Sequence, residues 1–135
     1  MKTLIVEDDF TSRLLLQELL KNYGSAHIAV NGKEAVEAVH LALEMGEPYD
    51  LICIDIMMPE MDGQEALRQI REQEEARGIL SSKGAKIVMT TALGDTQNVI
   101  SAWRSLCDAY LIKPIQKAKL LEELRKLGLT QKRGE

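Results

Sequence analysis

The stretch LICIDIMMPEMDG, residues 51–63, indicates what kind of fold the chain adopts. Its first four residues are all apolar, which is typical of a parallel strand covered by helices on both faces. The apolar run stops at Asp55, and Met58-Pro59 follows as a turn. An acidic side chain therefore stands at the carboxyl end of a strand, which is the edge where open α/β sheets bind their ligands.

Similar apolar runs alternate with segments of helical period along the whole chain. We expect strands at Leu4 to Val6, Leu51 to Ile54, Ile87 to Met89 and Tyr110 to Ile112, with a weaker one at Ile28 to Val30. Apolar residues three or four apart predict helices at Thr11 to Leu20, Ala35 to Leu43, Glu65 to Glu75, Thr96 to Leu106 and Leu120 to Leu127. Strict alternation with right-handed crossovers predicts an α/β three-layer sandwich.

Composition limits the possible functions. The 135 residues, 45% hydrophobic and 28% charged, fit one domain with one core. A net charge of −4 with scattered Lys and Arg argues against direct binding of nucleic acid. No run is apolar enough for a membrane span and no export pattern is evident, so we expect no membrane contact and a cytoplasmic location. We expect Cys53 and Cys107 to be buried apolar residues, and we assign no role to His27 and His40.

The other predicted strands also end in polar residues. Glu7, Asp8 and Asp9 follow the first strand, Thr90 and Thr91 the fourth, and Lys113-Pro114 the fifth. Clustered carboxylates repel one another unless a cation compensates them, and hard oxygen ligands suit Mg²⁺. Lys113 adds a compact positive charge and Thr91 a hydroxyl donor. Together with Asp55 they predict a site for a carboxylate nucleophile, a metal ion and a phosphoryl group.

Each of these strand ends also has a simpler explanation. The acidic run at residues 7–9 could be a helix cap, Asp55 could begin a turn, and Lys113-Pro114 could be a surface strand end. The presence of four polar endings at one predicted edge favours the functional interpretation.

Four motifs resemble those of the receiver domains of two-component response regulators. They are Val6-Glu7-Asp8-Asp9, Ile54 to Pro59 with Met61-Asp62-Gly63, Thr91-Ala92, and Tyr110 to Pro114. The resemblance extends over about residues 1–128, which we expect to form the domain, and leaves residues 129–135 as a loose tail. It implies a flavodoxin-like (βα)5 fold whose five-stranded parallel sheet has the order 2-1-3-4-5.

The resemblance also implies a role for each site residue. Asp55 resembles the phosphoacceptor, and Glu7 and Asp8 resemble the acidic pair that binds Mg²⁺ together with Asp55 and the Met57 carbonyl. Thr91 resembles the switch hydroxyl, and Lys113 resembles the residue that pairs with phosphoryl oxygens. Tyr110 resembles the aromatic residue that turns inward on activation. The family's bond equivalent to Lys113-Pro114 is usually cis.

A receiver of this kind implies particular partners. It takes a phosphoryl group from a sensor histidine kinase and signals through the surface of its fourth helix, fifth strand and fifth helix. Because no DNA-binding or enzymatic segment follows the fifth helix, we expect the output to be contact with a downstream protein or a phosphotransfer domain. No separate substrate is expected, only self-catalysed phosphotransfer to Asp55 and autodephosphorylation.

The chain departs from the family pattern in three places. Leu106 replaces a usual Gly, the connection from Ala76 to Gly84 is long, and Met57 and Leu93 are apolar where polar residues are common. Met57 and Leu93 either shield the acyl phosphate from in-line water or are incidental boundary residues. We expect Trp103 to pack against the fifth strand rather than face a partner.

Three other functions are alternatives to the receiver hypothesis. A haloacid-dehalogenase-like phosphatase needs a second Asp where this chain has Met57. A flavodoxin-like flavin binder needs a phosphate loop where this chain has Glu7-Asp8-Asp9, and acidic residues there repel phosphate. The third alternative is a phosphorylation-independent protein-binding module on the same fold. Retention of the full set of site residues argues against it.

Overall fold

Strands and helices alternate along the chain, as the sequence predicted. This computed structural model describes residues 1–56, 63–80, 82–92 and 106–130. The elements are β1 (Thr3–Val6), α1 (Phe10–Leu20), a short 3-10 helix (Lys21–Tyr23), β2 (Ala26–Ala29), α2 (Gly32–Glu44), β3 (Leu51–Asp55), α3 (Gly63–Ala76), β4 (Lys86–Thr91), β5 (Ala109–Ile112) and α5 (Lys117–Lys126). The helix expected at Thr96 to Leu106 lies, except for its last residue, outside the described residues.

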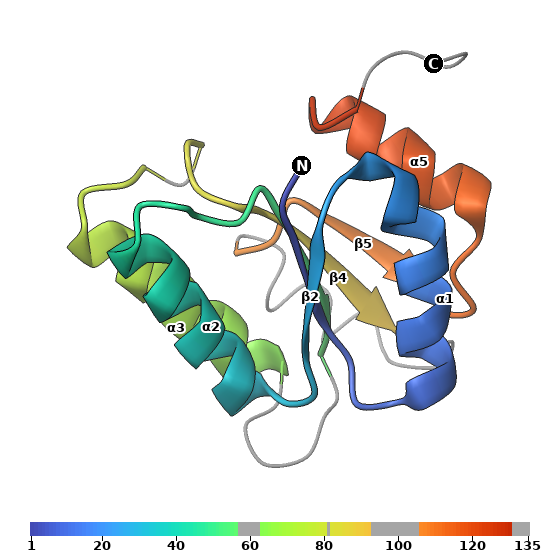
Figure 1. Ribbon diagram of the computed structural model, residues 1–135, viewed down its shortest axis with the longest axis horizontal. Helices are drawn as coiled ribbons and strands as arrows, with labels where there is room; N and C mark the ends of the chain where they lie inside the picture. Colours follow the sequence, from blue (N-terminus) through green and yellow to red (C-terminus); the bar gives the residue numbers. More distant parts are fainter. Residues whose placement is uncertain (57–62, 81, 93–105, 131–135) are drawn as a thin grey trace.

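The five strands form one parallel sheet in the order β2-β1-β3-β4-β5. Helices α2 and α3 cover one face of this sheet, and α1 and α5 cover the other (Figure 1). The predicted three-layer α/β sandwich and the flavodoxin-like strand order are both confirmed. Among the described residues, no helix is both long enough and apolar enough to cross a membrane.

The central strand β3 has apolar residues on both of its faces because both faces are buried. Ile52 and Ile54 belong to the core cluster under α2 and α3. Leu51 and Cys53 alternate with them and belong to the cluster under α1 and α5. Burial raises the pKa of the Cys53 thiol to about 12, so it behaves as a small apolar residue. The same expectation for Cys107 is wrong, because that residue lies in the turn before β5 and is only partly buried.

A buried ion pair anchors the long connection between α3 and β4. The Glu74 carboxylate is 4% exposed and accepts hydrogen bonds from the Ala85 N–H and from Arg71, each at 2.8 Å. Gly84 passes so close that a Cβ there would lie 2.4 Å from the Glu74 oxygens. These contacts hold the carboxyl-terminal end of the connection, just before β4, against α3.

Arg71 also fixes the chain just before β5. Its guanidinium donates to the Leu106 carbonyl at 2.8 Å and to the Asp108 carboxylate at 3.0 Å. Asp108 in turn accepts from the Ile87 N–H at 2.8 Å, which connects this segment to β4. The carbonyl at Leu106, where the family usually has Gly, is therefore satisfied by an arginine side chain.

Gly63 is needed where α3 begins, because the helix approaches the end of β3 closely. Its N–H donates to the Ile56 carbonyl at 3.1 Å. A Cβ at this position would lie 2.2 Å from the Asp55 carbonyl oxygen and 2.4 Å from the Ile56 Cα. Both neighbours are main-chain atoms, so any side chain here displaces the backbone that carries Asp55.

We predict that Glu74→Gln lowers the free energy of unfolding by about 2 to 3 kcal/mol, because it leaves the buried Arg71 with an incomplete set of charged partners. This loss of stability should be smaller than that for a charge left without any partner, because Asp108 still pairs with Arg71. Urea unfolding measures it, and Glu75→Gln at the exposed next position is the control. Equal stability of the two variants would show that the ion pair is unimportant.

We also predict that Gly63→Ala costs about 1 to 3 kcal/mol and shifts the amide NMR signals of Asp55 and Ile56, because the added methyl group overlaps their backbone. The control is Gln64→Ala, one residue further along α3. Signals at Asp55 and Ile56 that match those of the control would contradict the predicted close approach.

Candidate functional site

The strand register brings the predicted site residues to one edge of the sheet. Val6 pairs with Ile54, so the residues that follow them, Glu7 and Asp55, are neighbours at the carboxyl ends of β1 and β3. Asp55 itself pairs with Thr90 of β4. Thr91 pairs with Ile112 and accepts a main-chain hydrogen bond from Lys113 at 2.7 Å. Residues from four strands therefore meet where the sequence predicted.

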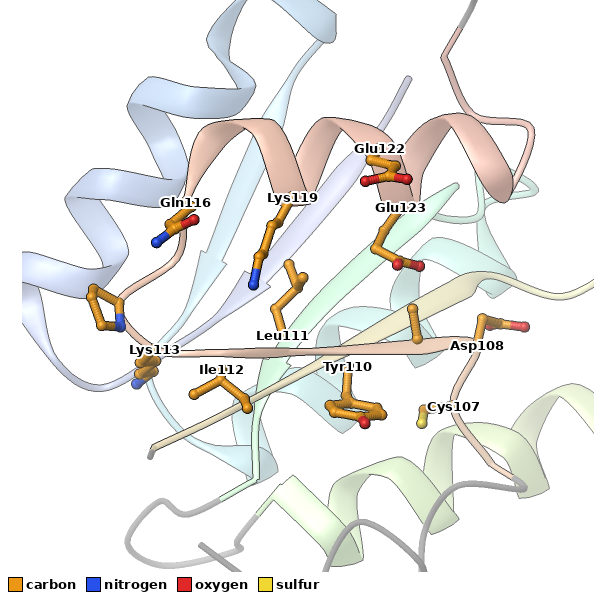
Figure 2. Close-up of a pocket in the computed structure, with 12 residues that line it drawn as sticks. Cys107, Asp108, Tyr110, Leu111, Ile112, Lys113, Gln116, Lys119, Glu122 and Glu123 are labelled. Atoms are coloured by element: carbon orange, nitrogen blue, oxygen red, sulfur yellow. The ribbon is translucent and has the colours of Figure 1, made fainter. Parts of the chain in front are cut away.

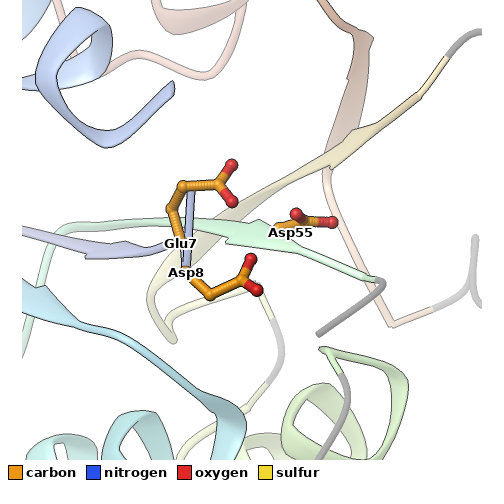
Figure 3. Close-up of side chains that lie close together, drawn as sticks. All are labelled: Glu7, Asp8 and Asp55. Atoms are coloured by element: carbon orange, nitrogen blue, oxygen red, sulfur yellow. The ribbon is translucent and has the colours of Figure 1, made fainter. Parts of the chain in front are cut away.

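Three carboxylates form the centre of this edge (Figure 3). Glu7, Asp8 and Asp55 each offer one oxygen, and these oxygens lie within 4.8 Å of one another. Glu7 is fully buried and Asp55 is 7% exposed, whereas Asp8 is open to solvent. A set of carboxylate oxygens with one solvent-facing side suits a hard divalent cation that keeps part of its water shell.

Lys113 bridges the two buried carboxylates. Its Nζ lies 2.5 Å from Glu7 Oε1 and 2.9 Å from Asp55 Oδ2. Burial, and then the neighbouring Asp55, raise the pKa of Glu7 to about 7 even though Lys113 opposes the shift. Burial alone would lower the pKa of Lys113, but its hydrogen bonds to Glu7 and Asp55 outweigh burial and raise it. The ammonium group thus compensates the charge of the acidic cluster.

The turn between β1 and α1 orients Glu7. The Asp9 N–H donates to Glu7 Oε2 at 3.2 Å. Asp9 caps α1 by accepting from the Ser12 N–H at 2.8 Å, which makes it the N-cap residue and lowers its pKa. The acidic run at residues 7–9 therefore fits both interpretations of its sequence. Asp9 caps the helix, while Glu7 and Asp8 face Asp55.

A pocket lies beside β5 and shares Lys113 with the site. Lys113, Tyr110 and residues of α5 line it (Figure 2). Leu111 points toward α5, whereas Tyr110 and Ile112 point away from it. Tyr110 is 41% exposed, so its ring is outside the core in this structure.

Other predictions from the sequence have mixed outcomes. The Lys113-Pro114 peptide bond is cis, as the resemblance implied. Met57, Leu93 and Trp103 lie outside the described residues, so their expected roles stay predictions. Arg13 lies outside the motifs that predict the site, yet its side chain donates to the Glu7 carbonyl.

The comparisons with known proteins agree with this geometry. The family model described as "Response regulator receiver domain" matches residues 3–125. Chemotaxis protein CheY of Listeria monocytogenes is 32% identical over 126 residues, which cover 93% of this chain and 97% of CheY. The probable transcriptional regulatory protein SilR of Salmonella typhimurium is 32% identical over 127 residues, which cover 94% of this chain. The chain spans 50% of the length of SilR.

A solved structure gives the same result. The receiver domain of the histidine kinase CKI1 from Arabidopsis thaliana, complexed with Mg²⁺ and BeF3⁻, is similar with a TM-score of 0.77 and 28% identity. The match covers 96% of this chain and 90% of that one. The alternative of a phosphorylation-independent binding module is not favoured by these relatives. The chain belongs to the receiver domains of response regulators, which act in two-component signalling.

Proposed function

We propose that Asp55 accepts a phosphoryl group from a sensor histidine kinase and that the chain passes this signal on by protein contact. The observation that carries the proposal is the Lys113 ammonium bound to Asp55 and Glu7 beside Asp8. A nucleophilic carboxylate, further acidic ligands and a positive charge are what phosphoryl transfer to an aspartate requires.

Mg²⁺ is the proposed cofactor of this site. Glu7, Asp8 and Asp55 would hold it, with the Met57 carbonyl as a further ligand implied by the family resemblance. When bound, the ion neutralises charge on the carboxylates and on the incoming phosphoryl oxygens. The similar CKI1 receiver domain was solved with Mg²⁺ bound, which supports this assignment.

The transfer itself would use three side chains of this protein. An Asp55 oxygen attacks the phosphorus of a phosphohistidine, the phosphorus–nitrogen bond breaks, and the imidazole leaves. Lys113 would exchange its carboxylate contacts for a phosphoryl oxygen, and the Thr91 hydroxyl would donate to another. Thr91 is 1% exposed at the end of β4, so a small displacement of its side chain would be felt by β5.

The proposed output is a changed surface around β5 and α5. Withdrawal of Thr91 and Lys113 toward the phosphoryl group would open space for the exposed Tyr110 ring to turn inward. A downstream protein or a phosphotransfer domain would bind this surface differently when Tyr110 points outward and when it points inward. A cytoplasmic location stays a prediction from the sequence.

Incubation with Mg²⁺ and acetyl phosphate should add one phosphoryl group to the wild-type chain, and intact mass spectrometry detects it. Asp55→Asn should abolish the adduct because the amide is a poor nucleophile. Asp50→Asn changes an aspartate at the other end of β3 and should leave the adduct intact. Absence of any Asp55-dependent adduct would instead support the phosphorylation-independent binding module.

Replacing Met57 by Asn together with Leu93 by Glu should speed dephosphorylation several-fold, because polar groups would admit and orient the attacking water. The decay of the acyl phosphate after removal of the donor measures this rate. The matched control is Met45→Asn with Leu80→Glu. Met45 caps the carboxyl end of α2, Leu80 lies in the connection before β4, and both are exposed. A rate equal to that of the control would make Met57 and Leu93 incidental.

A further inference from the structure

The position of Asp8 depends on the main chain rather than on side-chain contacts. Glu7 is held by Lys113 and by the Asp9 N–H. The Asp8 carboxylate is exposed and, within the described part of the chain, makes no hydrogen bond or ion pair. Its oxygen nevertheless lies within 4.8 Å of the other two carboxylates. The peptide between Glu7 and Asp8 must therefore set the direction of the Asp8 side chain.

Two hydrogen bonds fix the main chain at Glu7. On one side, its N–H donates to the Ala29 carbonyl of β2 at 3.0 Å. On the other side, its carbonyl accepts from Arg13 Nη1 at 3.2 Å. The first bond continues the sheet, whereas the second comes from a side chain one turn into α1. Arg13 is therefore the side chain that restrains the peptide plane leading into Asp8.

The Arg13 side chain is itself restrained. Its main-chain N–H donates to the Asp9 carbonyl at 2.9 Å in the first turn of α1. Its guanidinium lies over the Phe10 ring, with Cζ 5.5 Å from the ring centre. A guanidinium stacked in this way loses little conformational freedom when it donates to a carbonyl.

We propose that Arg13 is a positioning residue for the metal site, which it serves by holding the Glu7–Asp8 peptide so that Asp8 faces Glu7 and Asp55. The inference rests on the proposed Mg²⁺ site. Within the described part of the chain, Arg13 contacts the Glu7 main-chain carbonyl and forms no ion pair with the carboxylates of Glu7, Asp8 or Asp55. Outer partners of this kind typically change metal affinity by about 10- to 100-fold when they are removed.

The direction of the effect separates positioning from electrostatics. Arg13 carries a positive charge close to an acidic cluster, so a purely electrostatic influence repels Mg²⁺. Removing that charge would then tighten Mg²⁺ binding. A positioning role predicts the reverse, because loss of the hydrogen bond frees Asp8 and weakens binding.

The experiment is an NMR titration with Mg²⁺ at constant ionic strength on wild type, Arg13→Met, Arg13→Lys and Arg125→Met. Methionine keeps an unbranched side chain beside Phe10 but has neither charge nor donor. Lysine keeps the charge and one flexible donor. Arg125→Met makes the same charge change at the exposed carboxyl end of α5.

We expect Arg13→Met to raise the Mg²⁺ dissociation constant about tenfold, Arg13→Lys to raise it less, and Arg125→Met to leave it unchanged. Phosphorylation of Asp55 by acetyl phosphate should recover at saturating Mg²⁺ in both Arg13 variants, which also shows that they are folded. Unchanged or tighter Mg²⁺ binding by Arg13→Met would overturn the positioning role. Failure of wild type to bind Mg²⁺ would refute the proposed metal site instead.

Discussion

The ammonium group of Lys113 lies between two buried carboxylates, 2.5 Å from Glu7 and 2.9 Å from Asp55. Placing two carboxylates side by side in a poorly hydrated edge is unfavourable unless a positive charge compensates them. The parallel register of β1, β3, β4 and β5 makes this contact possible because it brings all the strand ends together. In the proposed function, a bound metal ion would compensate the carboxylates and free Lys113 to pair with the anionic phosphoryl group.

The opposite edge of the sheet has a different organisation. There the Arg71 guanidinium binds Glu74, Asp108 and the Leu106 carbonyl, and so ties α3 to the start of β4 and to the segment before β5. These contacts use most of the Arg71 donors and are partly buried, which gives that end of the molecule a structural role. The ion pairs at this edge therefore hold helices and strands together, whereas those at the other edge belong to the proposed phosphorylation site.

The sequence was sufficient to predict the parallel sheet and the residues at its edge, because unbroken apolar runs and the polar residues that end them are local features. It could not reveal contacts between distant segments. The helical period of α3 places Arg71 and Glu74 on the same face as Leu67 and Ile70, but it does not show that Arg71 binds Glu74 and Asp108. The close approach of Gly63 to Asp55 and the bond from Arg13 to the Glu7 carbonyl likewise depend on the folded backbone. The expected burial of Cys107 is wrong, because an apolar side chain in the segment before a strand need not enter the core.

In the proposed function, Lys113 leaves the buried carboxylates when a phosphoryl group arrives at Asp55. A crystal structure of the chain with Mg²⁺ and a beryllofluoride analogue would show where Lys113 goes. We expect the analogue on Asp55, Mg²⁺ among Glu7, Asp8 and Asp55, and the Lys113 Nζ in contact with a fluoride rather than with Glu7. If Asp55 carries the analogue while Lys113 keeps its contact with Glu7, Lys113 does not respond to phosphorylation in this way.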